Sequence, residues 1–127
     1  MRIVAAIVIA CATCANAQPS ERLLDAIRHV ESGGRDLTGD GGRAIGPYQI
    51  HRRYWQDAVR LDPSLGGTYN DCRREQYARR VVRVYLAHYG KGKTDEQMAR
   101  IHNGGPTGHR KRATVGYWTK IRRVLGV

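Results

Sequence analysis

The sequence predicts a mainly α-helical domain of the α+β type, with about five helices and one small β-hairpin beside a cleft. Five segments carry apolar residues at spacings of three or four, which is the period of an amphipathic helix. Glycine, proline or asparagine interrupts the chain between them. One stretch, residues 35–50, is rich in glycine and has only short apolar pieces, which favours a hairpin or an irregular loop.

The first two helices are expected on either side of this glycine-rich stretch. Ser20 is suited to cap a helix over 21–32, because its hydroxyl can accept from the first backbone N–H groups. A second helix over 52–61 ends at Asp62-Pro63, because the residue before a proline is pushed out of the helical region. Between the helices, 44–45 and 48–50 are the expected ordered parts of the hairpin.

Caps and apolar stripes predict three more helices. Asp71 is expected to cap the longest one, which ends at Gly90. Thr94 and Gln97 have the spacing of a capping box and open the next helix. The expected ranges are about 72–89, 94–101 and 113–125, with loops at 62–70, 91–93 and 103–112.

Residues 1–17 read as a secretory signal peptide. Arg2 supplies a positive start, Ile3 to Ala12 an apolar run, and Ala15-Asn16-Ala17 a cleavage site of the A-x-A type. Cleavage would leave residues 18–127 as a single domain, secreted to the exterior or, in a bacterium, to the periplasm. This apolar run is too short for a membrane span, and no other apolar run is long enough for one.

The charge balance is strongly basic. Removing Arg2 and no acidic residue lowers the formal net charge from +11 to +10. Such a protein is attracted to polyanions such as an anionic bacterial wall surface. A non-enzymatic cationic protein that binds walls or membranes is therefore one hypothesis. Specific nucleic-acid binding is not expected, since no RRM, KH or zinc-finger pattern is present.

Cysteine usage excludes an internal disulfide in the mature chain. Cys11 and Cys14 lie in the signal peptide, so only Cys72 remains. The histidines are scattered without the spacing of a metal site, and no cysteine pair is left for zinc. No metal or cofactor is expected.

Two carboxyl groups in contrasting surroundings suggest glycosidase chemistry. Glu31 lies four residues after Ile27, on the apolar face of the first helix and at its end. Partial burial should raise its pKa, as a general acid requires near neutral pH. Asp40 follows in a glycine-rich turn, where a carboxylate stays solvated and ionised. Pairs of this kind occur in retaining and inverting glycosidases.

Two segments, the first of which contains Glu31 and Asp40, carry a family resemblance. The first is VESGG…GD…GPYQIHRRYWQDA over 30–58, and the second is ARIHNGGPTGHRKRATVGYWTKI over 99–121. Together they resemble the invertebrate-type, destabilase-like lysozymes, in order and over nearly all of the mature chain. The resemblance implies a lysozyme-like fold and a muramidase that cleaves β-1,4 bonds between N-acetylmuramic acid and N-acetylglucosamine in peptidoglycan. A chitin-like oligosaccharide is the other expected ligand.

The resemblance also implies roles for individual residues. Glu31 matches the family's proton donor and Asp40 its nucleophile or stabilising carboxylate. The positions matching its saccharide cleft are His51, Arg52, Arg53, Tyr54, Trp55, Gln56, Asp57, Tyr85, His102, Asn103 and Gly104. Tyrosine and tryptophan offer flat faces to sugar rings, although core packing is the alternative for Tyr54, Trp55 and Tyr85.

The chain departs from the family pattern at its cysteines. Gly34, Ile45 and His109 stand where the family has cysteine, and Cys72 stands at a family cysteine whose partner is absent. The interval from Glu31 to Asp40 is also shorter than in animal members. A lytic transglycosylase that uses Glu31 alone therefore stays an alternative. The isopeptidase activity credited to some members has no supporting triad here.

Overall fold

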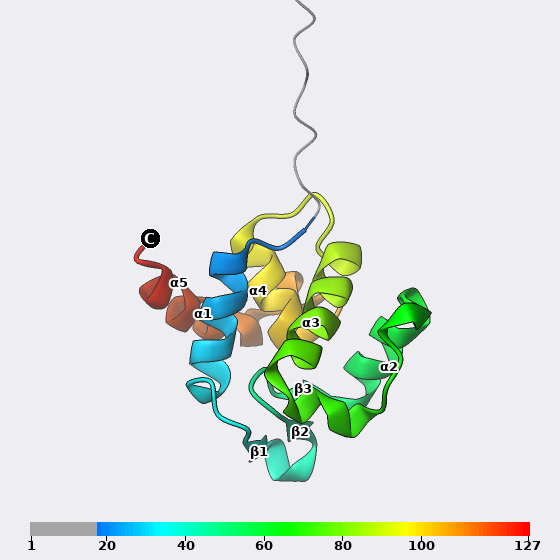
Figure 1. Ribbon diagram of the computed structural model, residues 1–127. Helices are drawn as coiled ribbons and strands as arrows, with labels where there is room; N and C mark the ends of the chain where they lie inside the picture. Colours follow the sequence, from blue (N-terminus) through cyan, green and yellow to red (C-terminus); the bar gives the residue numbers. More distant parts are fainter. Residues whose placement is uncertain (1–17) are drawn as a thin grey trace, which may run out of the picture.

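The computed structural model describes residues 18–127, and Figure 1 shows them as one body of packed helices with a small sheet at one end. The predicted signal peptide, residues 1–17, lies outside the described residues. One hydrophobic core joins all five α-helices and the sheet. No helix among the described residues is both long and apolar enough to cross a membrane.

The predicted mainly α class is confirmed. The helices are α1 (Glu21–Ser32), α2 (Arg52–Leu61), α3 (Glu75–Tyr89), α4 (Asp95–Gly104) and α5 (Val115–Leu125). The first two have the predicted bounds. Ser20 caps α1 as expected, since its hydroxyl accepts from the Leu23 N–H at 3.0 Å. Gly33 ends α1 in the left-handed conformation.

The β element is a three-stranded antiparallel sheet, where the sequence predicted one hairpin. Its strands are β1 (Thr38–Gly39), β2 (Ala44–Ile45) and β3 (Ile50–His51), in the order β1-β2-β3. Thr38 pairs with Ile45, which pairs with Ile50. The sequence missed β1 because a strand of two polar or small residues has no alternating pattern to detect.

The prediction for the third helix was wrong at its start. Residues Tyr69–Arg73 form a separate 3₁₀ turn, and α3 begins only at Glu75. Arg74 between them is extended, with φ −87° and ψ 128°. Asp71 caps the 3₁₀ turn, because its carboxylate accepts from the Thr68 N–H at 2.7 Å. Asp71 therefore does act as a capping residue, but for the 3₁₀ turn and not for α3.

The last two helices also shift relative to the prediction. The capping box of Thr94 and Gln97 forms as predicted. However, α4 runs on to Gly104 and turns off only at Gly105, where φ reaches 86°. The basic loop before α5 contains two 3₁₀ turns, Gly108–Arg110 and Arg112–Thr114. The extension of α4 keeps Asn103 on a helix instead of in a loop.

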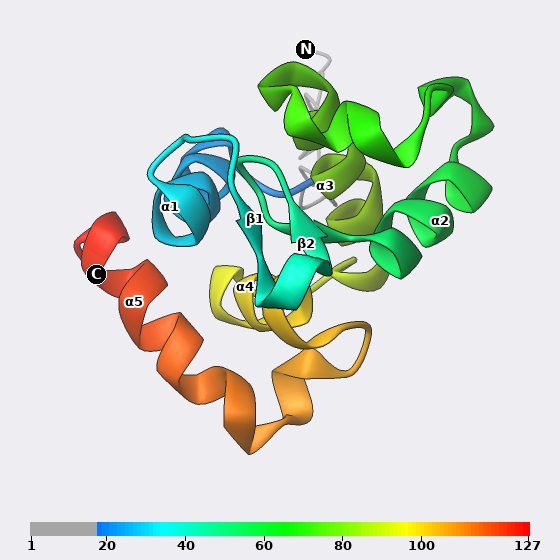
Figure 2. The same cartoon turned by 90° about the horizontal axis from the view of Figure 1, so that it is seen from below.

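The sheet lies between α1 and α2 (Figure 2). Helix α5 packs against α1 and α4. On the other side, Arg79 of α3 ties α1 to the loop after β2. Its guanidinium donates to Asp25 at 2.7 Å and to the Tyr48 hydroxyl at 2.9 Å. These contacts hold the first half of α1 and the loop after β2 against α3.

Candidate active site

Glu31 occupies the last turn of α1, one residue before the helix ends. Its position after the fully buried Leu24 and Ile27 draws the side chain toward the core, and it is half-buried. The next residue, Ser32, anchors the helix end, because its hydroxyl donates to the Pro47 carbonyl at 2.7 Å. The Glu31 carboxyl is therefore held between the core and the opening beside the sheet.

Burial raises the pKa of Glu31 from an ordinary value near 4.5 to about 7, because desolvation disfavours the charged form. Two neighbours act in the opposite direction. The Tyr117 hydroxyl faces the carboxyl, and the Lys120 ammonium attracts its negative charge. The buried Tyr117 hydroxyl forms no hydrogen bond of ordinary geometry within residues 18–127, so it is free to donate to the carboxyl. The predicted rise in pKa is confirmed, so Glu31 keeps its proton over much of the acidic to neutral range.

Asp40 begins the turn between β1 and β2 and is open to solvent. It holds a left-handed backbone conformation, with φ 50°, which aspartate tolerates better than most residues. Its carboxylate pairs with two basic side chains, His51 at 3.1 Å and Arg43 at 3.0 Å. The contrast predicted between a desolvated Glu31 and a solvated Asp40 is present.

Both carboxyl groups line one cleft of about 260 Å³. Glu31 comes from α1 and Asp40 from the β1–β2 turn, so two separate elements supply them. The other lining residues are Ala44, Gln49, His51, His102 and Asn103. A proton donor and a carboxylate that face one cleft can act on a bond placed between them.

The cleft continues into a second hollow of about 250 Å³ that shares His51, His102 and Asn103 with it. Tyr54 and Tyr85 are both buried and stack with ring centroids 3.6 Å apart. Both line the hollow and are also part of the core. The remaining lining residues are Arg53, Asp57, Gly105 and Pro106.

His102 has a structural place in this site. Its Nε2 lies 3.1 Å from the Tyr48 carbonyl, which can only accept, so Nε2 carries the proton. Nδ1 then accepts from the Tyr54 hydroxyl at 3.0 Å. Burial lowers the pKa of His102 to about 4. The ring is thus neutral near pH 7 and holds the neighbouring Asn103 at the cleft.

Four residues of the predicted saccharide set lie elsewhere. Trp55 is partly buried and donates from Nε1 to the Tyr77 hydroxyl at 2.8 Å, so it faces the interior. Gln56 is exposed on α2. Arg52 lies over the Tyr69 ring, beside the cleft. The Gly104 carbonyl accepts from Lys111.

The structure adds site residues that the sequence reading left out. Gln49 lines the cleft from a left-handed position, φ 50°, and donates from its amide to the Leu37 and Gly46 carbonyls at 2.9 Å each. A signal was available, because Gln49 is the only polar side chain between two apolar ones in the GPYQI block. Tyr117 and Lys120 carried no such signal, since only the packing of α5 on α1 brings them to Glu31.

Comparison with known proteins agrees with this geometry. The Destabilase family model matches residues 20–124, which is nearly all of the described chain. The chain belongs to the destabilase family. Lysozyme from Meretrix lusoria is 34% identical, over 84% of this chain and 91% of that protein. Lysozyme 1 from Crassostrea virginica is 37% identical, over 81% of this chain and 58% of that protein.

Solved structures of two lysozymes share the fold. Meretrix lusoria lysozyme in complex with Aeromonas hydrophila PliI matches with a TM-score of 0.72 at 33% identity, over 84% of this chain and 91% of that one. Tapes japonica lysozyme matches with a TM-score of 0.70 at 28% identity and the same coverage. The lysozyme-like architecture predicted from the sequence is therefore confirmed.

Proposed function

We propose that this destabilase-family protein is a secreted lysozyme that hydrolyses the β-1,4 bond between N-acetylmuramic acid and N-acetylglucosamine in peptidoglycan. Residues 1–17 direct export and residues 18–127 form the catalytic domain. The observation that carries the proposal is the pair of carboxyl groups in one cleft, with Glu31 desolvated and Asp40 solvated. The similarity to bivalve lysozymes supports the same substrate class.

Glu31 acts first, as the general acid. With its pKa near 7 it is protonated at mildly acidic pH and donates to the glycosidic oxygen as the bond to the anomeric carbon breaks. The carboxylate that forms is stabilised by the Tyr117 hydroxyl and by Lys120, the two groups that lower its pKa. Desolvation therefore favours the starting acid, and these neighbours limit the cost of the product anion.

Asp40 acts at the anomeric carbon. Its carboxylate attacks that carbon, or stabilises the positive charge that develops there, while His51 and Arg43 hold the carboxylate in place. Water then completes hydrolysis with Glu31 as the base that removes its proton. Asn103 supplies an amide group at the cleft wall that can hydrogen-bond acetamido and hydroxyl groups of the sugars, and Gln49, whose amide hydrogens are already donated, can add its side-chain oxygen as an acceptor.

Mass spectrometry of the products from purified peptidoglycan tests the proposal. Hydrolysis adds one water to each cleaved bond, whereas a lytic transglycosylase forms an anhydro-sugar and adds none. We expect hydrolysed ends from the wild type and a steep loss of turnover in Asp40→Asn. Anhydro ends together with full activity in Asp40→Asn would reduce Asp40 to a turn residue and establish the transglycosylase alternative.

The net charge of +10 expected for the mature chain favours one further candidate, a cationic protein that acts on walls without catalysis. Killing by charge alone would survive Glu31→Gln, because that change leaves the basic surface intact. Loss of lysis in Glu31→Gln with unchanged binding to wall fragments assigns the lysis to catalysis.

A further inference from the structure

A third hollow, of about 360 Å³, opens beside the catalytic cleft and is strongly basic. We name it the arginine hollow, and its lining residues are Gly42, Arg43, His51, Arg52, Arg53 and Tyr69. We infer that the arginine hollow binds a carboxylate of the acidic peptide stem carried by N-acetylmuramic acid. This inference rests on the proposed function, because it concerns what is attached to the sugar in the cleft.

The position of the hollow suits a substituent of the bound glycan. His51 lines the cleft between Glu31 and Asp40, the second hollow beside Tyr54 and Tyr85, and the arginine hollow. The three spaces therefore meet at this one side chain. Arg53 lines both the second hollow and the arginine hollow. A group that branches from a sugar near His51 can therefore reach the arginines while the sugar stays in the cleft.

The charge in the hollow is largely uncompensated. Among residues 18–127 no carboxylate forms an ion pair with Arg52 or Arg53, and both side chains are exposed. Arg43 already pairs with Asp40. Two guanidinium groups are thus available to an anion. Their planar forks match a carboxylate with two parallel hydrogen bonds.

The hollow is also partly preorganised. The Arg52 guanidinium lies 4.5 Å from the centre of the Tyr69 ring, in a cation–π arrangement. Tyr69 is itself fixed, because its hydroxyl donates to the Ile50 carbonyl at 2.6 Å. A side chain that is already held against an aromatic face loses less freedom when it binds an anion.

A peptide stem fits these features better than a long wall phosphate polymer does. The hollow has a volume of about 360 Å³ and meets the cleft at His51, so a short substituent of the bound sugar can occupy it. A stem attached to the bound sugar also arrives at high effective concentration, so even a weak carboxylate contact adds to binding. A chitin-like oligomer has no stem and gains nothing from the hollow.

The test measures binding of a product that is too short to be cleaved. The ligand is the disaccharide N-acetylglucosaminyl-N-acetylmuramic acid with its peptide stem, and its matched partner has the stem carboxyls amidated. Calorimetry at low salt should give the full-length mature protein about three- to tenfold tighter binding of the acidic form. Arg52→Gln should remove most of that ratio, and Arg52→Lys should retain part of it, since lysine keeps the charge but not the fork.

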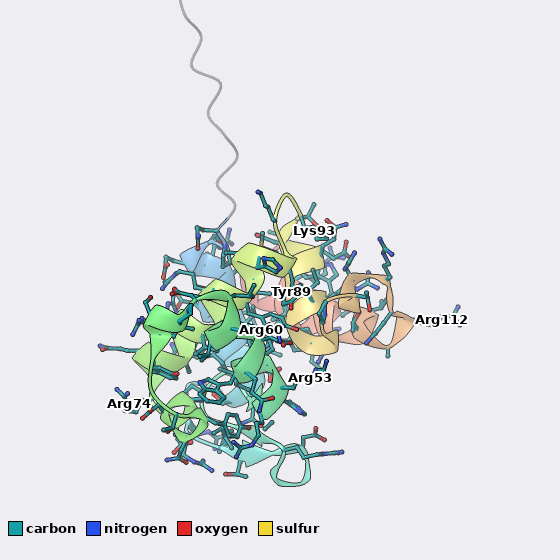
Figure 3. All side chains as sticks on the ribbon, turned by 90° about the vertical axis from the view of Figure 1, so that its right-hand side faces the viewer. Arg53, Arg60, Arg74, Tyr89, Lys93 and Arg112 are labelled. Carbon is teal, nitrogen blue, oxygen red and sulfur yellow. The ribbon has the colours of Figure 1, made fainter. Side chains whose placement is uncertain are left out.

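Arg112→Gln is the matched control. Arg112 is exposed in the loop that follows α4, and Figure 3 shows it projecting from a part of the surface separate from Arg53 on α2. The control makes the same change in net charge, so it should leave the ratio unchanged. Equal losses in Arg52→Gln and Arg112→Gln would overturn the inference in favour of a general field effect.

Two other results would also overturn it. One is equal affinity of the wild type for the acidic and amidated ligands. The other is a glycerol-phosphate oligomer whose binding depends on Arg52 while the stem preference does not, which would assign the hollow to wall phosphate. Because the ligand is not cleaved, the outcome is independent of turnover. Absence of peptidoglycan hydrolysis with an intact stem preference would refute the proposed function alone.

Discussion

Replacing Glu31 by glutamine separates two effects of this residue, its contribution to turnover and its effect on the free energy of unfolding. The rise in the pKa of Glu31 from about 4.5 to about 7 means that ionising it in the folded protein costs about 3 kcal/mol more than in the unfolded chain. Glutamine never ionises, so it escapes this cost. It also cannot donate a proton, so turnover should fall by about 10²-fold or more.

The pH dependence has a definite sign. Below about pH 4 Glu31 is protonated in both the folded and the unfolded wild type, so its ionisation does not affect the free energy of unfolding. Between about pH 4.5 and pH 7 the unfolded state releases the proton while the folded state retains it, so the free energy of unfolding falls as pH rises. Above pH 7 the full destabilisation of about 3 kcal/mol is present.

Urea unfolding of wild type and Glu31→Gln near pH 4 and pH 8 measures this difference. The mutant should gain about 3 kcal/mol relative to wild type between the two pH values, while its peptidoglycan hydrolysis stays near zero. Glu96→Gln, an exposed change in the first turn of α4, is the control and should shift by less than about 1 kcal/mol. A stability difference that does not change with pH would refute the desolvation of Glu31, and wild-type turnover would refute its role as acid.

Three further predictions follow from buried contacts. Gly46→Ala should destabilise the protein by about 3 kcal/mol or more in urea unfolding, because its Cβ would lie 1.9 Å from the Cys72 carbonyl oxygen at a φ of 78°; wild-type stability would contradict this packing. The Cys72 thiol is buried with its pKa raised to about 12, so a thiol reagent should label it only after denaturation. With a pKa near 4, the His102 ring should show no NMR titration between about pH 8 and pH 5.5. In the same contact, Tyr54→Phe should lower the free energy of unfolding by about 1–3 kcal/mol, because it leaves the His102 Nδ1 without a donor.

The helices and the raised pKa of Glu31 could be predicted because their causes are local in sequence. The stripe of α1 places Glu31 on the buried face, and both the helix bounds and the rise in its pKa agree with that argument. Caps were less reliable where two elements competed for one residue. Asp71 satisfied the rule for a helix start, yet the extended Arg74 assigned it to the 3₁₀ turn before α3.

The contacts of Glu31 and Asp40 are long-range and left no pattern in the sequence. Tyr117 lies far along the chain from Glu31 and reaches it only because α5 packs on α1. The pair of Asp40 and His51 depends on the register of a sheet that was predicted as a hairpin with different bounds. A single sequence shows which residues are able to do the chemistry, but the partners that set their pKa and orientation come from tertiary packing.

His102 shows why a motif does not by itself assign a role. Its place beside Asn103 and its imidazole ring would suit a general base, and it does line the cleft. However, both ring nitrogens are occupied, by the Tyr48 carbonyl and by the Tyr54 hydroxyl, and burial lowers its pKa to about 4. A neutral ring with no free nitrogen cannot exchange protons with a substrate. His102 therefore serves the cleft by position, and the proposed function assigns the chemistry to Glu31 and Asp40.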